Sequence, residues 1–133
     1  MGKKYLLDSN VIIGFLAAKI PQDGMKIVSE MIDQIPNISV ISQIEVLRFN
    51  DTPENEASLE KFINTSVIYP LSNNVIKHTI KLCKQSKIKL PDAIIAATAL
   101  TEGLTLVTRN IDDFKKIPNL ELFDPFTYCS KDK

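Results

Sequence analysis

The sequence alternates short apolar runs with longer segments of helical periodicity, and this alternation constrains the fold more than any other feature. Runs at residues 4–7, 38–41, 66–69 and 104–107 have the length and side chains of strands. No two-residue turn joins neighbouring runs, which favours parallel strands with helical crossovers over hairpins. The chain is therefore predicted to be an α/β protein of three layers, with helices on both faces of a central parallel sheet.

Capping residues, prolines and apolar periodicity mark the expected helices. Helices are expected at residues 10–18, 23–35, 42–48, from 53 onward, 72–87 and 92–102, with a short turn or helix at 110–115 and an edge strand at 121–123. Ser42 and Glu45 have the spacing of a capping box, which predicts a helix start at Ser42. In residues 72–87 the predicted buried stripe consists of Val75, Ile76, Thr79, Ile80 and Cys83.

The segment from Asp92 to Glu102 consists almost entirely of small or apolar residues, so a helix there must be buried. Pro91 suits the first turn of that helix, and Gly103 suits its C-terminal cap. These two residues predict both ends of the helix.

Composition fits one soluble domain over residues 1–133, with a short polar tail from about residue 125. Hydrophobic residues make up 44% of the chain, but no apolar run is long enough to span a membrane. The 16 basic and 16 acidic residues leave no basic excess of the kind that nucleic-acid-binding proteins usually carry. Cys83 and Cys129 have no zinc spacing, and we expect them to be free thiols in the cytoplasm.

Acidic residues follow the predicted strands or begin the predicted helices. Asp8 ends the first strand, Glu45 follows the second, Asp92 opens the buried helix, and Asp112 and Asp113 follow the fourth strand. Because ligand sites of open parallel sheets gather beyond the carboxyl ends of the strands, these acids are expected to converge. Clustered carboxylates favour Mg²⁺ or Mn²⁺, and such ions support phosphodiester hydrolysis without a histidine base.

Each acid also has a purely structural interpretation. Asp8 is suited to cap the helix that follows it, Glu45 to complete the capping box, and Asp92 to place charge at a helix N-terminus. Asp112 and Asp113 are ordinary turn residues. Structural caps are expected at both ends of a sheet, so the placement of all these acids at one end favours a functional site.

Four segments, in order, resemble the PIN domain and most closely the VapC-type toxins of prokaryotic toxin–antitoxin pairs. The segments are residues 6–13 (LLDSNVII), 41–47 (ISQIEVL), 90–99 (LPDAIIAATA) and 106–114 (LVTRNIDDF). The resemblance runs from about Tyr5 to Phe123, nearly the whole chain. It implies a three-layer α/β/α fold, a Mg²⁺ or Mn²⁺ site and endoribonuclease activity.

The resemblance also implies roles for individual residues. It matches Asp8, Glu45 and Asp92 to the three acids of the metal site. Many members have Asp where this chain has Asn110, whereas the pattern T-R-N-x-x-D-F matches Asp113 as the fourth acid. The implied catalytic and metal-binding set is Asp8, Glu45, Asp92 and Asp113, with Asn10, Thr108 and Asn110 as supporting polar residues.

The same resemblance implies an RNA substrate, an antitoxin protein as partner and a homodimer. No membrane partner is expected, because no apolar run is long enough to span a bilayer. Lys81, Lys84 and Arg109 are the candidate RNA contacts, and the same hypothesis extends to Lys77 and Lys87 on the lysine face of the helix and to Lys115 and Lys116. The alternative for the lysines of this helix is the solvated face of an amphipathic helix, which is commonly lysine-rich.

Three other interpretations of the sequence compete with a metal-dependent nuclease. A degenerate PIN-like module would keep the fold and serve as a non-catalytic RNA-binding or scaffold subunit, but all three principal acids are present. Aspartyl-phosphate phosphatases need a second Asp two residues after the first, where this chain has Asn10. A receiver-like phosphoacceptor is a weaker alternative, because it needs an early acidic pair and a lysine at the end of the fifth strand.

Overall fold

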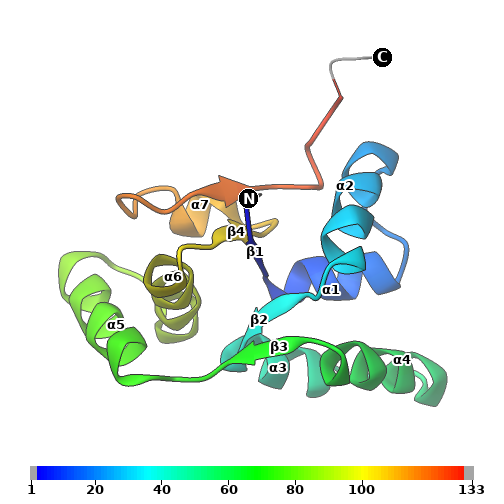
Figure 1. Cartoon of the computed structure of the whole chain (residues 1–133), viewed down its shortest axis with the longest axis horizontal. Helices are drawn as coiled ribbons and strands as arrows, with labels where there is room; N and C mark the ends of the chain where they lie inside the picture. Colours follow the sequence, from blue (N-terminus) through cyan, green and yellow to red (C-terminus); the bar gives the residue numbers. More distant parts are fainter. Residues whose placement is uncertain (1–2, 131–133) are drawn as a thin grey trace.

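The computed structural model describes residues 3–130, in which strands and helices alternate as expected (Figure 1). The strands are β1 (Tyr5–Leu7), β2 (Asn37–Ser39), β3 (Val67–Tyr69), β4 (Thr105–Val107) and β5 (Leu122–Phe123). The helices are α1 (Ser9–Leu16), α2 (Gln22–Asp33), α3 (Val40–Leu47), α4 (Pro53–Asn64), α5 (Asn73–Gln85), α6 (Leu90–Glu102) and α7 (Ile111–Phe114).

The five strands form one parallel sheet in the order β3-β2-β1-β4-β5. β1 lies at its centre, where Leu6 is in register with Asn37 of β2 on one side and with Leu106 of β4 on the other. β5 is an edge strand, as predicted. The expected three-layer α/β/α architecture is therefore confirmed, and all carboxyl ends of the strands point the same way.

Alternation along the central strands divides the core between the two faces of the sheet. Leu6 and Leu106 pack into a cluster with residues of α5, α6 and α7, whereas Leu7 and Val107 pack into a cluster with residues of α1 to α4. Figure 1 shows α5 and α6 on one side of the sheet and α1 and α2 on the other. Each of the central strands β1 and β4 thus packs against helices on both faces of the sheet.

The helix α6 is buried along most of its length, as predicted. Residues 93–99 are all buried, Pro91 lies in the first turn, and Gly103 ends the helix with φ 68°. That left-handed conformation favours glycine because it has no Cβ. The burial of α6 fixes the position of Asp92 in its first turn.

The predicted start of α3 is wrong. The helix begins at Val40, and its cap is Ser39, whose hydroxyl oxygen accepts hydrogen bonds from the backbone N–H groups of Ile41 and Ser42. Ser42 therefore lies inside the helix, and its buried hydroxyl has no hydrogen-bond partner within residues 3–130. Both serines suit a cap, but the pairing of β2 with its neighbours ends at Ser39 and decides between them.

The predicted buried stripe of α5 is only partly correct. Val75 and Thr79 are buried, but Leu82 completes the stripe, whereas Ile76 and Ile80 are exposed. Cys83, also predicted to be buried, is an exposed free thiol. The apolar residues of this helix spread beyond one narrow stripe, so periodicity leaves its orientation undetermined, and packing against α6 selects the buried face.

The segment after β5 packs against α2. Pro125 is buried, and a Cβ on Gly24 would lie 1.7 Å from its carbonyl oxygen, so the close approach requires glycine. Phe126 packs against the cluster formed with α1 to α4. Among residues 3–130, none of the helices combines the length and apolar character needed to cross a membrane.

Candidate metal centre

Asp8 lies where the central strand β1 passes into α1. Its backbone N–H donates to the carbonyl oxygen of Val107, which continues the pairing of β1 with β4 by one residue. Its side chain caps α1, because Oδ1 accepts a 2.8 Å hydrogen bond from the backbone N–H of Ser9. Only 4% of Asp8 is exposed. The capping role predicted for Asp8 is real, and the second carboxylate oxygen remains available for other contacts.

Thr108 and Asn10 contact this second oxygen. The Thr108 hydroxyl donates to Oδ2 of Asp8 at 2.9 Å, and Nδ2 of Asn10 lies 3.4 Å from the same oxygen. The backbone N–H of Asn110 donates to Oγ1 of Thr108 at 3.1 Å, and the backbone N–H of Arg109 donates to Oδ1 of Asn10 at 3.1 Å. The first and last motifs therefore interlock, with Asn110 contributing its backbone.

The pKa of Asp8 is raised from 3.8 to about 6. Burial is the largest cause, and the negative charges of Glu45 and Asp92 raise it further. The hydrogen bonds from Thr108 and from the Ser9 backbone oppose this rise, because they favour the ionised carboxylate. The fold thus holds a buried carboxylate close to two other acids.

Glu45 reaches the site from α3, and Ser9 holds it there. The Ser9 hydroxyl donates a 3.0 Å hydrogen bond to Oε1 of Glu45. Ser9 therefore contacts two site acids, Asp8 through its backbone N–H and Glu45 through its side chain. Sequence reasoning did not single out Ser9. Its place directly after Asp8, in the first turn of α1, was the signal available.

Asp92 approaches from the first turn of α6. Burial raises its pKa most, followed by the charges of Asp113 and Glu45, while Lys89 opposes the rise. Lys89, the N-terminal cap residue of α6, is therefore a positive charge that acts directly on a site acid. The acids of four separate segments thus act on one another at the carboxyl edge of the sheet.

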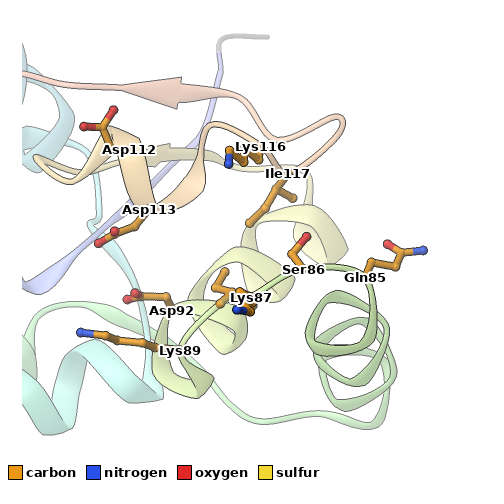
Figure 2. Close-up of a pocket in the computed structure, with 10 residues that line it drawn as sticks. Gln85, Ser86, Lys87, Lys89, Asp92, Asp112, Asp113, Lys116 and Ile117 are labelled. Carbon is orange, nitrogen blue, oxygen red and sulfur yellow. The ribbon is translucent and has the colours of Figure 1, made fainter.

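Asp113 and Asp112 point in different directions, as Figure 2 shows. Asp112 forms an exposed ion pair of 2.9 Å with Lys115. Asp113 has no ion pair within residues 3–130 and raises the pKa of Asp92. Of the two neighbours, Asp113 is therefore the one that faces the other acids.

The donor set suits a hard divalent cation. All the converging side chains are carboxylates, amides or hydroxyls, and Mg²⁺ and Mn²⁺ prefer oxygen ligands. Burial is the main reason that the pKa of Asp8 and of Asp92 is raised, and the repulsion between neighbouring acids, which such a cation relieves, adds to the rise. In the part of the chain that the structure describes, no three acidic, histidine or cysteine side chains stand close enough together to enclose an ion.

The candidate RNA contacts lie outside this cluster. Lys81 and Lys84 are on the exposed face of α5. Arg109 follows the site directly, and its guanidinium lies 4.7 Å from the centre of the Phe126 ring. His78 is exposed on α5, with Nδ1 2.6 Å from the Thr101 hydroxyl, so it is not part of the acidic site.

Together, the fold and this site define a three-layer α/β/α protein with an acidic centre beyond the carboxyl ends of a parallel sheet. The chain belongs to the PIN-domain family, whose pattern it matches over residues 5–120.

The chain is similar to a VapC-type ribonuclease and to chains of toxin–antitoxin complexes. Over 41 residues the chain is 51% identical to Ribonuclease VapC1 of Rickettsia felis, a match that covers 31% of this chain and 28% of that relative. A chain of a toxin–antitoxin complex from Klebsiella pneumoniae is 30% identical, with a TM-score of 0.76 and coverage of 92% of this chain and 98% of that one. DNA-bound VapBC from Salmonella typhimurium gives 25% identity, a TM-score of 0.77 and coverage of 93% and 99%.

Proposed function

We propose that this chain is a divalent-metal-dependent endoribonuclease, the toxin of a toxin–antitoxin pair, acting on RNA in the cytoplasm. The observation that carries the proposal is the carboxylate of Asp8, whose pKa is raised chiefly by burial and further by the charges of Glu45 and Asp92, yet which accepts hydrogen bonds that favour its ionised form. A purely structural cap does not need two further acids beside it. In a metal site, several acids lie together because the bound cation compensates for the repulsion between them.

Asp8, Glu45, Asp92 and Asp113 are the residues that would hold Mg²⁺ or Mn²⁺. When bound, such an ion activates water for attack on a phosphodiester and neutralises the charge that develops on the phosphate.

Neutral groups of the chain position these acids. Thr108 fixes one oxygen of Asp8, and the Ser9 hydroxyl fixes Glu45. Asn10 links Asp8, Thr108 and the backbone of Arg109. Such fixed donors limit the reorganisation that the site must undergo during the reaction.

The partner proposal rests on similarity. The relatives named above include a ribonuclease and chains of VapBC and other toxin–antitoxin complexes, some of them bound to DNA. An antitoxin protein and a second copy of the chain are the partners proposed here. A short open reading frame beside the gene, encoding a small DNA-binding protein, would support the antitoxin.

The central experiment is cleavage of a defined single-stranded RNA by purified protein with Mg²⁺ or Mn²⁺, with and without EDTA. Asp8→Asn tests the site, and Asp112→Asn is the matched control because Asp112 is exposed and paired with Lys115. We expect cleavage by wild type and Asp112→Asn, and loss of cleavage with EDTA or in Asp8→Asn.

Two results would contradict the proposal. Equal cleavage by wild type and Asp8→Asn would assign the activity to a contaminant. No cleavage by wild type, together with no Mn²⁺ binding in calorimetry, would favour a non-catalytic PIN-like module.

A further inference from the structure

A groove of about 430 Å³ begins at the acidic cluster and extends away from it (Figure 2). Its walls are the connection between α5 and α6 on one side and α7 with the residues after it on the other. Asp92 and Asp113 lie at one end, and Gln85 and Ser86 at the other (Figure 2). Its volume falls in the range of roughly 300 to 1,000 Å³ typical of ligand sites.

Three lysines line this groove: Lys87 and Lys89 on one wall and Lys116 on the other. The ion pairs of residues 3–130 are Lys3–Glu121 and Lys115–Asp112, so none of the three has a carboxylate partner within that range. The pairing with Lys115 also neutralises Asp112, one of the acids that line the groove. Away from the metal site, the groove therefore carries unpaired positive charge.

The remaining lining is neutral. Gln85 and Ser86 offer donors and acceptors, and Ile88 and Ile117 offer apolar surface. A nucleotide has the matching parts, because its phosphate is anionic, its ribose and base edges form hydrogen bonds, and its base has an apolar face.

We propose that this groove binds the RNA strand on one side of the scissile phosphate, with Lys87 and Lys116 contacting phosphates of the flanking nucleotides. The inference rests on the proposed ribonuclease function, because a strand cut at the acids must continue past them. That continuity favours RNA over an acidic peptide, which has no need to pass through the cleavage site. Lys89 is not assigned a phosphate contact here, since its charge acts on Asp92.

The proposal is distinct from contacts by Lys81 and Lys84 on α5. Lys81 lines a neighbouring depression of similar size, which shares Gln85 with the groove, together with His78 and Asn119. A strand that continued beyond Gln85 would meet Lys81 next. Lys87 and Lys116 should therefore affect binding of short RNA more than Lys81 does.

The test is the double variant Lys87→Ala/Lys116→Ala, with Lys26→Ala/Lys61→Ala as the charge-matched control. The control lysines are exposed on α2 and α4 and line no part of the groove. Lys89 is left intact because of its effect on Asp92. All four replaced lysines are exposed, so both variants should melt at the wild-type temperature.

Binding of a fluorescent single-stranded oligoribonucleotide is measured by anisotropy as salt is varied, with Asp8→Asn added to every protein to prevent cleavage. We expect the groove variant to raise the Kd roughly tenfold and to reduce the slope of log K against log salt by about 1.4, the value for two lost phosphate contacts. In the cleavage assay, KM should rise while kcat stays within about twofold. The reason is that the lysine–phosphate contacts stabilise the bound substrate and the transition state equally.

The outcomes separate the groove from the proposed function. If the protein with intact lysines binds and cuts RNA and the groove variant behaves like the control, the groove proposal is wrong and the nuclease stands. If RNA is neither bound nor cut, both fail. If the groove variant keeps RNA affinity but loses binding of polyglutamate, the groove is a protein-binding site and the RNA proposal is overturned.

Discussion

The Thr108 hydroxyl donates a 2.9 Å hydrogen bond to Oδ2 of Asp8, and both residues are buried. The bond joins the ends of the paired strands β1 and β4, so it exists only when the sheet has formed. It favours the ionised carboxylate and so limits how far burial raises the pKa of Asp8. This bond is a direct link between the sheet and the electrostatics of the site.

Thr108→Val should raise the pKa of Asp8 further above about 6, because it removes a donor that stabilises the ionised form. Since metal binding requires the ionised carboxylate, Mn²⁺ binding should then need a higher pH than in wild type. Stability should fall by about 1–3 kcal/mol, the usual result of losing a buried hydrogen-bond partner. Calorimetric Mn²⁺ titrations across a pH series measure the first effect, and thermal melts the second.

Thr98→Val is the matched control for this variant. Thr98 is also buried, but its hydroxyl donates to the carbonyl oxygen of Ile94 within α6, away from Asp8. Its Mn²⁺ binding should follow the wild-type pH dependence. The same shift in both variants would mean that the Thr108 bond has no specific effect on Asp8.

Asp8 should make the metal-free protein less stable as pH rises. Its pKa is about 6 in the folded protein, against the ordinary value of 3.8 for an aspartate, so the folded state binds the proton more tightly. This stabilisation is complete below 3.8 and is lost as pH rises through about 6. The shift corresponds to about 3 kcal/mol at most. Asp8→Asn should lack this loss and be more stable than wild type at neutral pH.

Denaturant unfolding of the two metal-free proteins, at pH values below 3.8 and above about 6, measures how their free energies of unfolding differ. Other groups titrate in both proteins, so the free energy of unfolding of Asp8→Asn is subtracted from that of wild type at each pH. A difference that does not change with pH would contradict the raised pKa of Asp8.

Asp113→Asn should weaken Mn²⁺ binding, whereas Asp112→Asn should leave it close to wild type. Asp113 acts electrostatically on Asp92, but Asp112 is exposed and paired with Lys115. Because exposed ion pairs contribute about 0–1 kcal/mol, Asp112→Asn should also have little effect on stability. Calorimetry with Mn²⁺ on the two variants side by side provides the measurement. Equal loss of affinity in both would remove the distinction between these neighbours.

Ser9→Ala should reduce RNA cleavage about fivefold, since the loss of one hydrogen bond of roughly 1 kcal/mol leaves Glu45 free to move. The backbone bond from Ser9 to Asp8 is retained, so the fold should persist. A role in positioning Glu45 predicts a fall in kcat with little change in KM, and recovery in Ser9→Thr, which restores the hydroxyl. Unchanged kcat in Ser9→Ala would show that Glu45 is positioned by other contacts.

The sequence by itself determined the elements whose signals are local. Thr52 caps α4, Ser72 caps α5, and Gly103 ends α6, because each of these interactions spans only a few residues. The apolar composition of α6 required its burial in any compact fold. The alternation of strands and helices predicted the parallel sheet, and the sheet in turn placed Asp8 and Thr108 at the same edge.

Tertiary structure decided the questions for which local signals offered two equal answers. Ser39 and Ser42 both suit a cap, and strand pairing chose Ser39. Asp112 and Asp113 are adjacent acids, and the orientation of α7 turned only Asp113 toward Asp92. The Ser9–Glu45 bond joins residues 36 apart in sequence, and no short-range pattern encodes a contact of that kind. Local interactions fix helix ends and periodicity, whereas the direction in which a side chain points depends on packing between distant segments.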